Sequence, residues 1–193
     1  MKLYYSPGAC SLASHIALIE GGVEHDAVKV DLKTHTTEDG MDYREISPRG
    51  YVPAIETGEH GLLTENPAVL VYLAERTDSL PKGGDYYRML EWIGFVGTEI
   101  HGAYHPLFGN DTDERQQKAK ATVARKYRLA AELMGDRDWL VGDAPTVADN
   151  YLFVTLLWAD KFGVEVPEAL AEFRRRNLER GAVKEAMKAE GLG

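Results

Sequence analysis

The residue type best suited to chemistry is the single cysteine, Cys10. It follows a short apolar segment, residues 1–5, and the turn Ser6-Pro7-Gly8, and it precedes apolar residues at helical spacing. A helix N-terminus favours a thiolate, so we expect this position to lower the thiol pKa. No C-x-x-C partner follows, so a redox cycle would need an external thiol. Cys10 is either a buried small hydrophobe or a working thiol in a reducing compartment.

Two histidines, His101 and His105, lie one helical turn apart in the second half of the chain. This spacing suits zinc, but a zinc site needs further ligands and none is evident nearby. We therefore expect no metal site. A lone histidine on a helix is more often a satisfied structural residue than a catalytic one.

The elements that must position Cys10 alternate between strand and helix over the first eighty residues. A helix from Cys10 ends at Gly21-Gly22, and Asn66 is predicted to be the N-cap of another, with Pro67 at its first position. A polar loop at 34–40 and a short helix near 41–45 lie between them. Strands are predicted at residues 1–5, 27–32, 51–56 and 61–63.

Strand signals vanish after a stretch that contains Pro81 and Gly83-Gly84. Apolar residues then recur at steps of three and four, which predicts long helices around 89–100, 123–134 and 147–158 and shorter ones at 167–179 and 182–189. Thr146 and Asp149 resemble a capping box. We predict an α/β domain at residues 1–78, a linker at 79–85 and an all-α domain at 86–193.

Composition excludes several classes of function. The 193 residues are 44% hydrophobic and 27% charged, which is ordinary for a globular protein, so disorder and fibrous repeats are excluded. The net charge of -9 gives no electrostatic reason to bind nucleic acid or an anionic membrane. No apolar run approaches a membrane span, and no signal peptide is visible, so we expect a cytoplasmic protein.

A set of short motifs, taken in order along the chain, is similar to the bacterial beta-class glutathione S-transferases. The resemblance implies that family's fold, a thioredoxin-like domain followed by an all-helical domain. One such motif would be weak, but the ordered set runs from residue 1 to about 155. The motifs are YYSPGACSLASH (4–15), VDL (30–32), SPRGYVPA (47–54), LLTEN (62–66), EW (91–92), TEIH (98–101), PTVAD (145–149) and YLF (151–153).

The resemblance implies a site for glutathione as co-substrate, with no permanently bound cofactor. It implies a cis proline in Tyr51-Val52-Pro53, where the Val52 backbone pairs with the cysteinyl unit of glutathione. Glu65 is implied to accept from the γ-glutamyl amine, while the helix that Asn66 opens holds the γ-glutamyl carboxylate. His35 stands where the family usually has a lysine for the glycyl carboxylate. Histidine is only partly charged at pH 7, so we expect weak glycyl binding that strengthens toward pH 6.

The resemblance also assigns Cys10 a role at the glutathione sulfur. In the beta class this cysteine forms a mixed disulfide with glutathione. Other transferase classes use a tyrosine or serine hydroxyl near the end of the first strand, so Tyr5 and Ser11 are secondary candidates.

In the second half, the resemblance implies that His101 faces the active site in a binding or catalytic role. Thr98 and Glu99 are implied to reach toward a neighbouring subunit's site in a homodimer. Two departures from the family pattern, Gly94 for an asparagine and Gly102 for a lysine, remove polar groups and put the details of thiol activation in doubt.

Two functions follow as hypotheses. The first is a detoxifying glutathione transferase that conjugates glutathione to a small hydrophobic electrophile, with disulfide or peroxide reduction through Cys10 as a further activity. The alternative is a non-catalytic, transferase-like binding or regulatory protein. Aromatic residues could line the electrophile pocket, although their helical spacing is also typical of core: Trp92, Tyr104, Phe108, Trp158 and Phe162.

Overall fold

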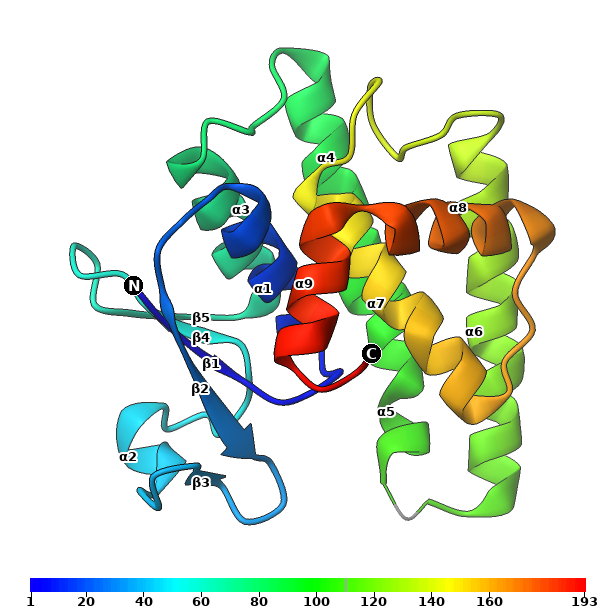
Figure 1. The fold of residues 1–193 in the computed structure, drawn as a ribbon. Coiled ribbons are helices and arrows are strands. Elements are labelled where there is room, and N and C mark those ends of the chain that lie inside the picture. The colour runs from blue at the N-terminus through cyan, green and yellow to red at the C-terminus, as the bar shows by residue number, and fades with distance from the viewer. Residues whose placement is uncertain (110) are drawn as a thin grey trace. The chain divides into compact units, whose positions relative to one another are not determined.

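The computed structural model describes residues 1–109 and 111–193. These form two compact units, one of Met1–Leu80 with Arg180–Gly193 and one of Pro81–Glu179 (Figure 1). The fold class predicted from the sequence, an α/β domain followed by a helical one, is confirmed.

The first unit is built on one five-stranded sheet. Its central strand, β1, is parallel to β2 and antiparallel to β4, with Leu3 opposite both Ala27 and Ile55. The parallel pair is joined by a crossover through the first helix, as a βαβ connection requires. The order is β3-β2-β1-β4-β5, from β1 (Lys2–Tyr5), β2 (Asp26–Asp31), β3 (Thr36–Thr37), β4 (Ala54–Glu56) and β5 (Leu62–Thr64).

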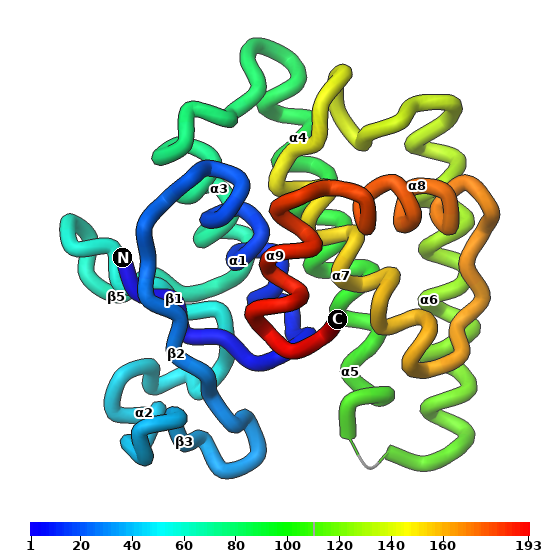
Figure 2. Tube along the Cα trace, viewed as in Figure 1, coloured from blue at the N-terminus to red at the C-terminus, as the bar shows by residue number. Residues whose placement is uncertain are grey.

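Four helices complete this unit: α1 (Ser11–Glu20), α2 (Tyr43–Ile46), α3 (Asn66–Arg76) and α9 (Gly181–Ala189). α1 packs against β1, α3 and α9, and the Cα trace shows α9, in red, alongside α1, in blue (Figure 2). Residues 11–18 of α1 are all buried, so this helix is covered on nearly every side. Leu3, Leu12 and Ile16 lie at the centre of the core.

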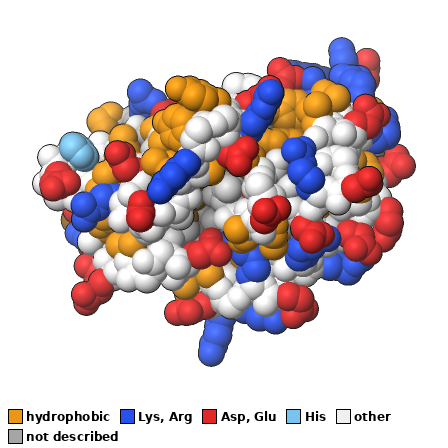
Figure 3. Space-filling view, turned by 90° about the horizontal axis from the view of Figure 1, so that it is seen from above, with side chains coloured by type: hydrophobic (Ala, Val, Ile, Leu, Met, Phe, Trp, Pro, Cys, Tyr) orange, Lys and Arg blue, Asp and Glu red, His pale blue; other side chains and the backbone are white. Residues whose placement is uncertain are grey.

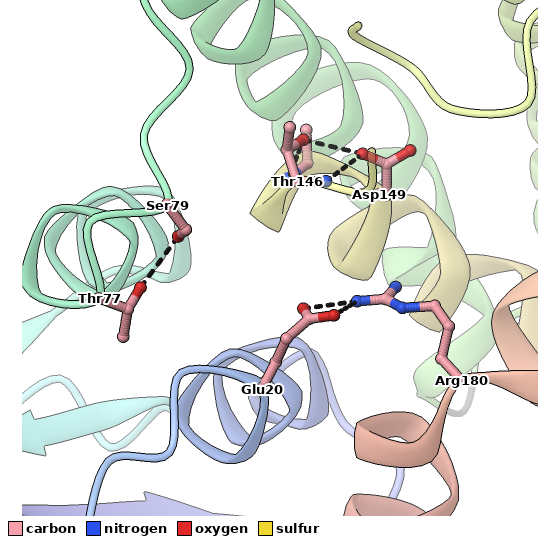
Figure 4. Close-up of polar contacts among 7 residues, drawn as sticks. Glu20, Thr77, Ser79, Thr146, Asp149 and Arg180 are labelled. Carbon is pink, nitrogen blue, oxygen red and sulfur yellow. Dashed lines mark hydrogen bonds and ion pairs between the residues drawn. The ribbon is translucent and has the colours of Figure 1, made fainter. Parts of the chain in front are cut away.

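The second unit consists of helices: α4 (Gly84–Phe95), the π-helical segment η1 (Val96–His101), α5 (Gly102–Phe108), α6 (Asp113–Met134), α7 (Val147–Phe162) and α8 (Glu168–Glu179). α7 is buried along most of its length and contacts α4, η1 and α8. Its predicted capping box is confirmed, because Asp149 accepts hydrogen bonds from the Thr146 N–H (2.7 Å) and hydroxyl (2.8 Å) (Figure 4).

Charged side chains of both signs are interleaved over the face in Figure 3, where blue and red groups surround smaller orange apolar areas. Within the described part of the chain, no helix is both long enough and apolar enough to cross a membrane.

Several boundaries differ from the sequence prediction. A two-residue strand, β3, pairs with β2 inside the expected loop at 34–40. The expected strand at 51–56 begins only at Ala54. The helical domain predicted at 86–193 is too long at its C-terminal end, because α9 packs on α1 and residues 180–193 group with the first unit.

Candidate active site

Cys10 lies at the end of a tight turn after β1. The Ala9 N–H donates to the Ser6 carbonyl at 3.0 Å, and Gly8 has φ of 69°, as the third residue of a type II turn requires. The Ser11 hydroxyl accepts from the Ser6 N–H at 3.2 Å, which ties the turn to the first residue of α1. Cys10 is then the N-cap of α1, with no side-chain capping hydrogen bond.

The Cys10 thiol donates to the Val52 carbonyl at 3.2 Å. Burial raises the pKa of this thiol to about 12, against the opposing effect of the Cys10 and Ser11 N–H groups, and the Glu65 carboxylate raises the pKa further. The expectation of a lowered pKa is therefore wrong, because desolvation outweighs the helix N-terminus. At neutral pH the group is a thiol that donates a hydrogen bond.

The segment before β4 lies beside Cys10. The Val52-Pro53 peptide bond is cis, as the resemblance implied. The Tyr43 hydroxyl donates to the Tyr51 carbonyl at 2.9 Å, and the side chain of Tyr51 is exposed. Because β4 starts at Ala54, residues 51–53 stand outside the sheet ladder, where an extended ligand could pair with them.

The N-terminus of α3 forms the next part of the site. Glu65, not Asn66, is the N-cap; it has φ of 70° and makes no side-chain capping bond, because its carboxylate pairs with Arg49. Asn66 is the first helical residue, and its Oδ1 accepts from the Ser14 hydroxyl of α1 at 3.0 Å. The first-turn N–H groups of α3 are thus not covered by a side-chain cap and suit an anion.

His35 lies in the segment between β2 and β3, directly before Thr36. Its φ is 56°, and its carbonyl accepts from the Tyr43 N–H at 2.8 Å. Its ring lies against Gly50, where an added Cβ would come within 3.0 Å of the ring. Nδ1 is buried and has no hydrogen-bond partner among the described residues.

The two secondary candidates have structural contacts in this structure. Ser11 is fully buried and its hydroxyl serves the Ser6 turn. Tyr5 is nearly buried and its ring stands 5.5 Å from that of His15. Burial and the Glu190 charge both raise the pKa of Tyr5, so it is a neutral phenol.

In the second unit, His101 ends the π-helical segment and lies in an aromatic environment. Its Nδ1 is 2.8 Å from the Tyr151 hydroxyl and its ring is 4.8 Å from that of Trp158. Burial, with a smaller effect of His105, lowers the pKa of His101 to about 4, so the imidazole is neutral at physiological pH. Short π-helical insertions are frequent at functional sites.

Thr98 and Glu99 share this segment but are more exposed. The Thr98 hydroxyl donates to the Gly94 carbonyl at 2.9 Å, within its own helix. Glu99 forms an ion pair with Lys126 of α6. No group of three metal-binding side chains occurs in the described part of the chain.

An aromatic cluster surrounds His101. The rings of Tyr104, Phe108, Trp158 and Phe162 lie 5.0 to 6.0 Å from one another in the pairs that touch. Tyr104 and Trp158 are buried and Phe162 is half-buried, but the side chain of Phe108 is 47% exposed. It can therefore offer an apolar surface to a ligand.

Sequence reasoning missed three polar partners of this region: Ser14, Arg49 and Glu190. Ser14 holds Asn66, Arg49 pairs with Glu65, and Glu190 accepts from the Gly8 N–H at 2.9 Å. Their partners lie between 16 and 182 residues away along the chain, so no local pattern indicated them.

Comparisons with known proteins agree with this geometry. The family described as "Glutathione S-transferase, N-terminal domain" matches residues 8–76, and the "Glutathione S-transferase, C-terminal domain" matches residues 95–177. The chain is 40% identical to the glutathione S-transferase GstA of Escherichia coli O157:H7, over all of both chains. It is 41% identical to a sphingomonad glutathione S-transferase solved with glutathione, with a TM-score of 0.94, and 40% identical to a beta-class enzyme of Sphingomonas chungbukensis, with a TM-score of 0.93; each comparison covers both chains completely.

Proposed function

The chain belongs to the glutathione S-transferase family, and to its bacterial beta class, so it is a glutathione transferase. We propose here which of its residues bind glutathione, act on its sulfur and contact the second substrate. The observation that supports the proposal best is the hydrogen bond from the Cys10 thiol to the Val52 carbonyl, in the same unit as the N-terminus of α3, which has no side-chain cap. These features lie in one unit and offer separate contacts for a thiol, a peptide backbone and a carboxylate. The non-catalytic alternative has no comparable support.

Glutathione is proposed to lie along the Tyr51–Pro53 segment. Its cysteinyl unit pairs with the Val52 backbone, and its γ-glutamyl carboxylate meets the N–H groups of α3 at Asn66. Glu65 accepts from the γ-glutamyl amine, at the expense of its ion pair with Arg49. His35 takes the glycyl carboxylate after its ring turns away from Gly50, where Nδ1 is buried.

Cys10 is proposed to act as a hydrogen-bond donor in the conjugation step. A thiol with a pKa of about 12 stays protonated, so its S–H turns from the Val52 carbonyl toward the glutathione sulfur and stabilises the thiolate there. The proton of the glutathione thiol goes to solvent, the thiolate attacks the electrophilic carbon, a C–S bond forms, and the leaving group departs with its bonding electrons. In the redox activity, the small fraction of Cys10 that has lost its proton to solvent attacks glutathione disulfide; the S–S bond breaks, a mixed disulfide forms and one glutathione thiolate leaves.

The second substrate is proposed to be a small apolar electrophile that contacts Phe108 and the aromatic cluster. His101, neutral and held by Tyr151, contributes a hydrogen bond rather than a charge. Thr98 and Glu99 are proposed to contact a neighbouring subunit's site.

Binding of S-methylglutathione, measured by calorimetry on wild type and Cys10→Ala, tests the site. This ligand keeps the peptide groups but forms no disulfide, so we expect one site per chain in both proteins. Cys10→Ala should lose disulfide exchange and retain part of the conjugation activity with chlorodinitrobenzene. Absence of binding at millimolar ligand would refute the proposed site.

A homodimer is proposed from the surface of the second unit. Tyr87 of α4 and Leu133 of α6 are 71% and 53% exposed, which is high for residues of their size. Leu133, Trp92 and Phe95 also line a hollow of about 530 Å³ between these helices. Light scattering that gives the mass of one chain, 21.4 kDa, would contradict the proposal.

A detoxifying role in the cytoplasm is proposed from the chemistry of the site. The chain has a single cysteine, and a free thiol at a glutathione site requires a reducing compartment. Mass spectrometry of the protein from intact cells would show free Cys10 or its glutathione adduct.

A further inference from the structure

A buried carboxylate joins the C-terminal segment to the turn that carries Cys10. Glu190, the C-cap residue of α9, has a side chain with no exposed surface. Its Oε1 lies 3.0 Å from Nδ1 of His15, and its Oε2 accepts from the Gly8 N–H at 2.9 Å.

Contacts at both ends of α9 fix its direction along α1. Arg180, the N-cap of α9, donates to both carboxylate oxygens of Glu20 at 2.6 Å, at the far end of α1 from Cys10 (Figure 4). Glu190 meets His15, which lies nearer to Cys10, so the two helices are antiparallel. α9 therefore delivers Glu190 to the end of α1 where the Cys10 turn begins.

The hydrogen bond that closes the turn joins the Ala9 N–H to the Ser6 carbonyl and does not involve the Gly8 N–H. The orientation of the Gly8 peptide therefore depends also on groups outside the turn. Glu190 supplies an acceptor, and the Leu192 methyl groups lie 3.5 and 3.8 Å from where a Gly8 Cβ would be. Cys10 follows two residues later.

We propose that Glu190 is a positioning residue for the transferase reaction. Through the Gly8 N–H it sets the position of the Ser6–Cys10 turn, and hence the direction in which the Cys10 thiol points. The inference rests on the proposed role of Cys10 at the glutathione sulfur. It predicts that losing Glu190 impairs use of the thiol more than binding of the peptide groups, which contact Val52 and α3.

The competing explanation is that Glu190 only holds α9 in place. Val183→Ala provides the control, because Val183 is fully buried on α9, two helical turns before Glu190. Glu185→Ala controls for loss of a carboxylate, since Glu185 is exposed on the same helix. Glu190→Gln keeps an acceptor for the Gly8 N–H, whereas Glu190→Asp keeps the charge and draws it back by about 1.5 Å.

The experiment compares these variants by kcat/KM for glutathione with chlorodinitrobenzene, by S-methylglutathione affinity and by hydrogen exchange of the Gly8 amide. We expect Glu190→Ala to lower kcat/KM about tenfold, to change S-methylglutathione affinity less than twofold, and to speed Gly8 exchange at least tenfold. Glu190→Gln should stay within about twofold of wild type, and Val183→Ala and Glu185→Ala should match wild type. If Glu190→Ala does not fold, Glu190→Asp carries the test, with a loss of about fivefold expected.

Unchanged kcat/KM in both Glu190→Ala and Glu190→Asp would overturn the inference. An equal loss in Val183→Ala, or a loss in Glu190→Gln as large as in Glu190→Ala, would overturn it too. Failure of wild type to bind S-methylglutathione would instead refute the proposed glutathione site. The two failures are therefore distinguishable.

Discussion

Alkylation of Cys10 by iodoacetamide should become faster with pH throughout the range from 6 to 10. The chain has one cysteine, so the mass of the intact protein reports reaction at this site alone. Only the thiolate reacts, and burial raises the pKa of Cys10 to about 12. The rate should therefore rise about tenfold per pH unit with no plateau below pH 10.

The size of the effect follows from the thiolate fraction. At pH 8 about one Cys10 in ten thousand is ionised, whereas a free cysteine with a pKa of about 8.5 is about one quarter ionised. A thiolate of higher pKa is intrinsically the better nucleophile, which recovers a factor of about forty. Cys10 should then react roughly sixty times more slowly than the same thiol in the urea-unfolded chain, before any further slowing by restricted access.

A plateau near pH 7 would refute this reasoning, because it would mean that the helix N-terminus outweighs desolvation. Glu65→Gln is the matched variant. The Glu65 charge raises the pKa of Cys10, so removing it should speed alkylation at a fixed pH. Slower alkylation in Glu65→Gln would contradict the assigned electrostatics.

Three further predictions concern stability. Asp149→Ala should lower the free energy of unfolding by about 3–5 kcal/mol in urea denaturation, because the buried N–H of Leu140 and the partly buried N–H of Thr146 lose their acceptor; a loss below about 1 kcal/mol would contradict the capping role. Gly8→Ala should cost about 1–2 kcal/mol by the same assay, because its φ of 69° disfavours a Cβ, and an unchanged midpoint would refute this. The pKa of His101 is about 4 in the folded chain, against a reference value of 6.5, so the unfolded chain binds more protons between these pH values. The free energy of unfolding should therefore fall as the pH drops through this range. His101→Gln should flatten that pH dependence in urea denaturation, and parallel curves for the variant and wild type would exclude this contribution of His101.

The architecture could be predicted because short stretches of sequence determine where each helix and strand begins and ends. Examples are the turn residues after β1, the helical spacing of apolar residues in α7 and the capping box at Thr146. The chemistry of Cys10 could not be predicted in the same way. Its position at a helix N-terminus is local, but its desolvation comes from the tertiary structure, in which the thiol contacts Val52, 42 residues further along the chain. The local effect was therefore predicted correctly and the net pKa shift wrongly.

The N-terminus of α3 shows the same limit. Pro67 and Asn66 are typical of a helix start, and the helix does begin there. The cap residue is Glu65, in a backbone region that favours glycine, and its carboxylate is engaged by Arg49. The π-helical turn of η1 left no signal, because Val96 and Ile100 are buried at a spacing that an ordinary helix also has.

The return of α9 to the first unit has a consequence for biosynthesis. A ribosome releases residues 1–80 first and the helices of 81–179 next, but the helix that covers α1 emerges only after both. Until then the contacts of α1 with α9 are missing, and so is the hydrogen bond from the Gly8 N–H to Glu190, 182 residues downstream. Closing so distant a contact is slow relative to local helix formation. The turn that carries Cys10 should therefore be among the last parts of the nascent chain to reach its final position.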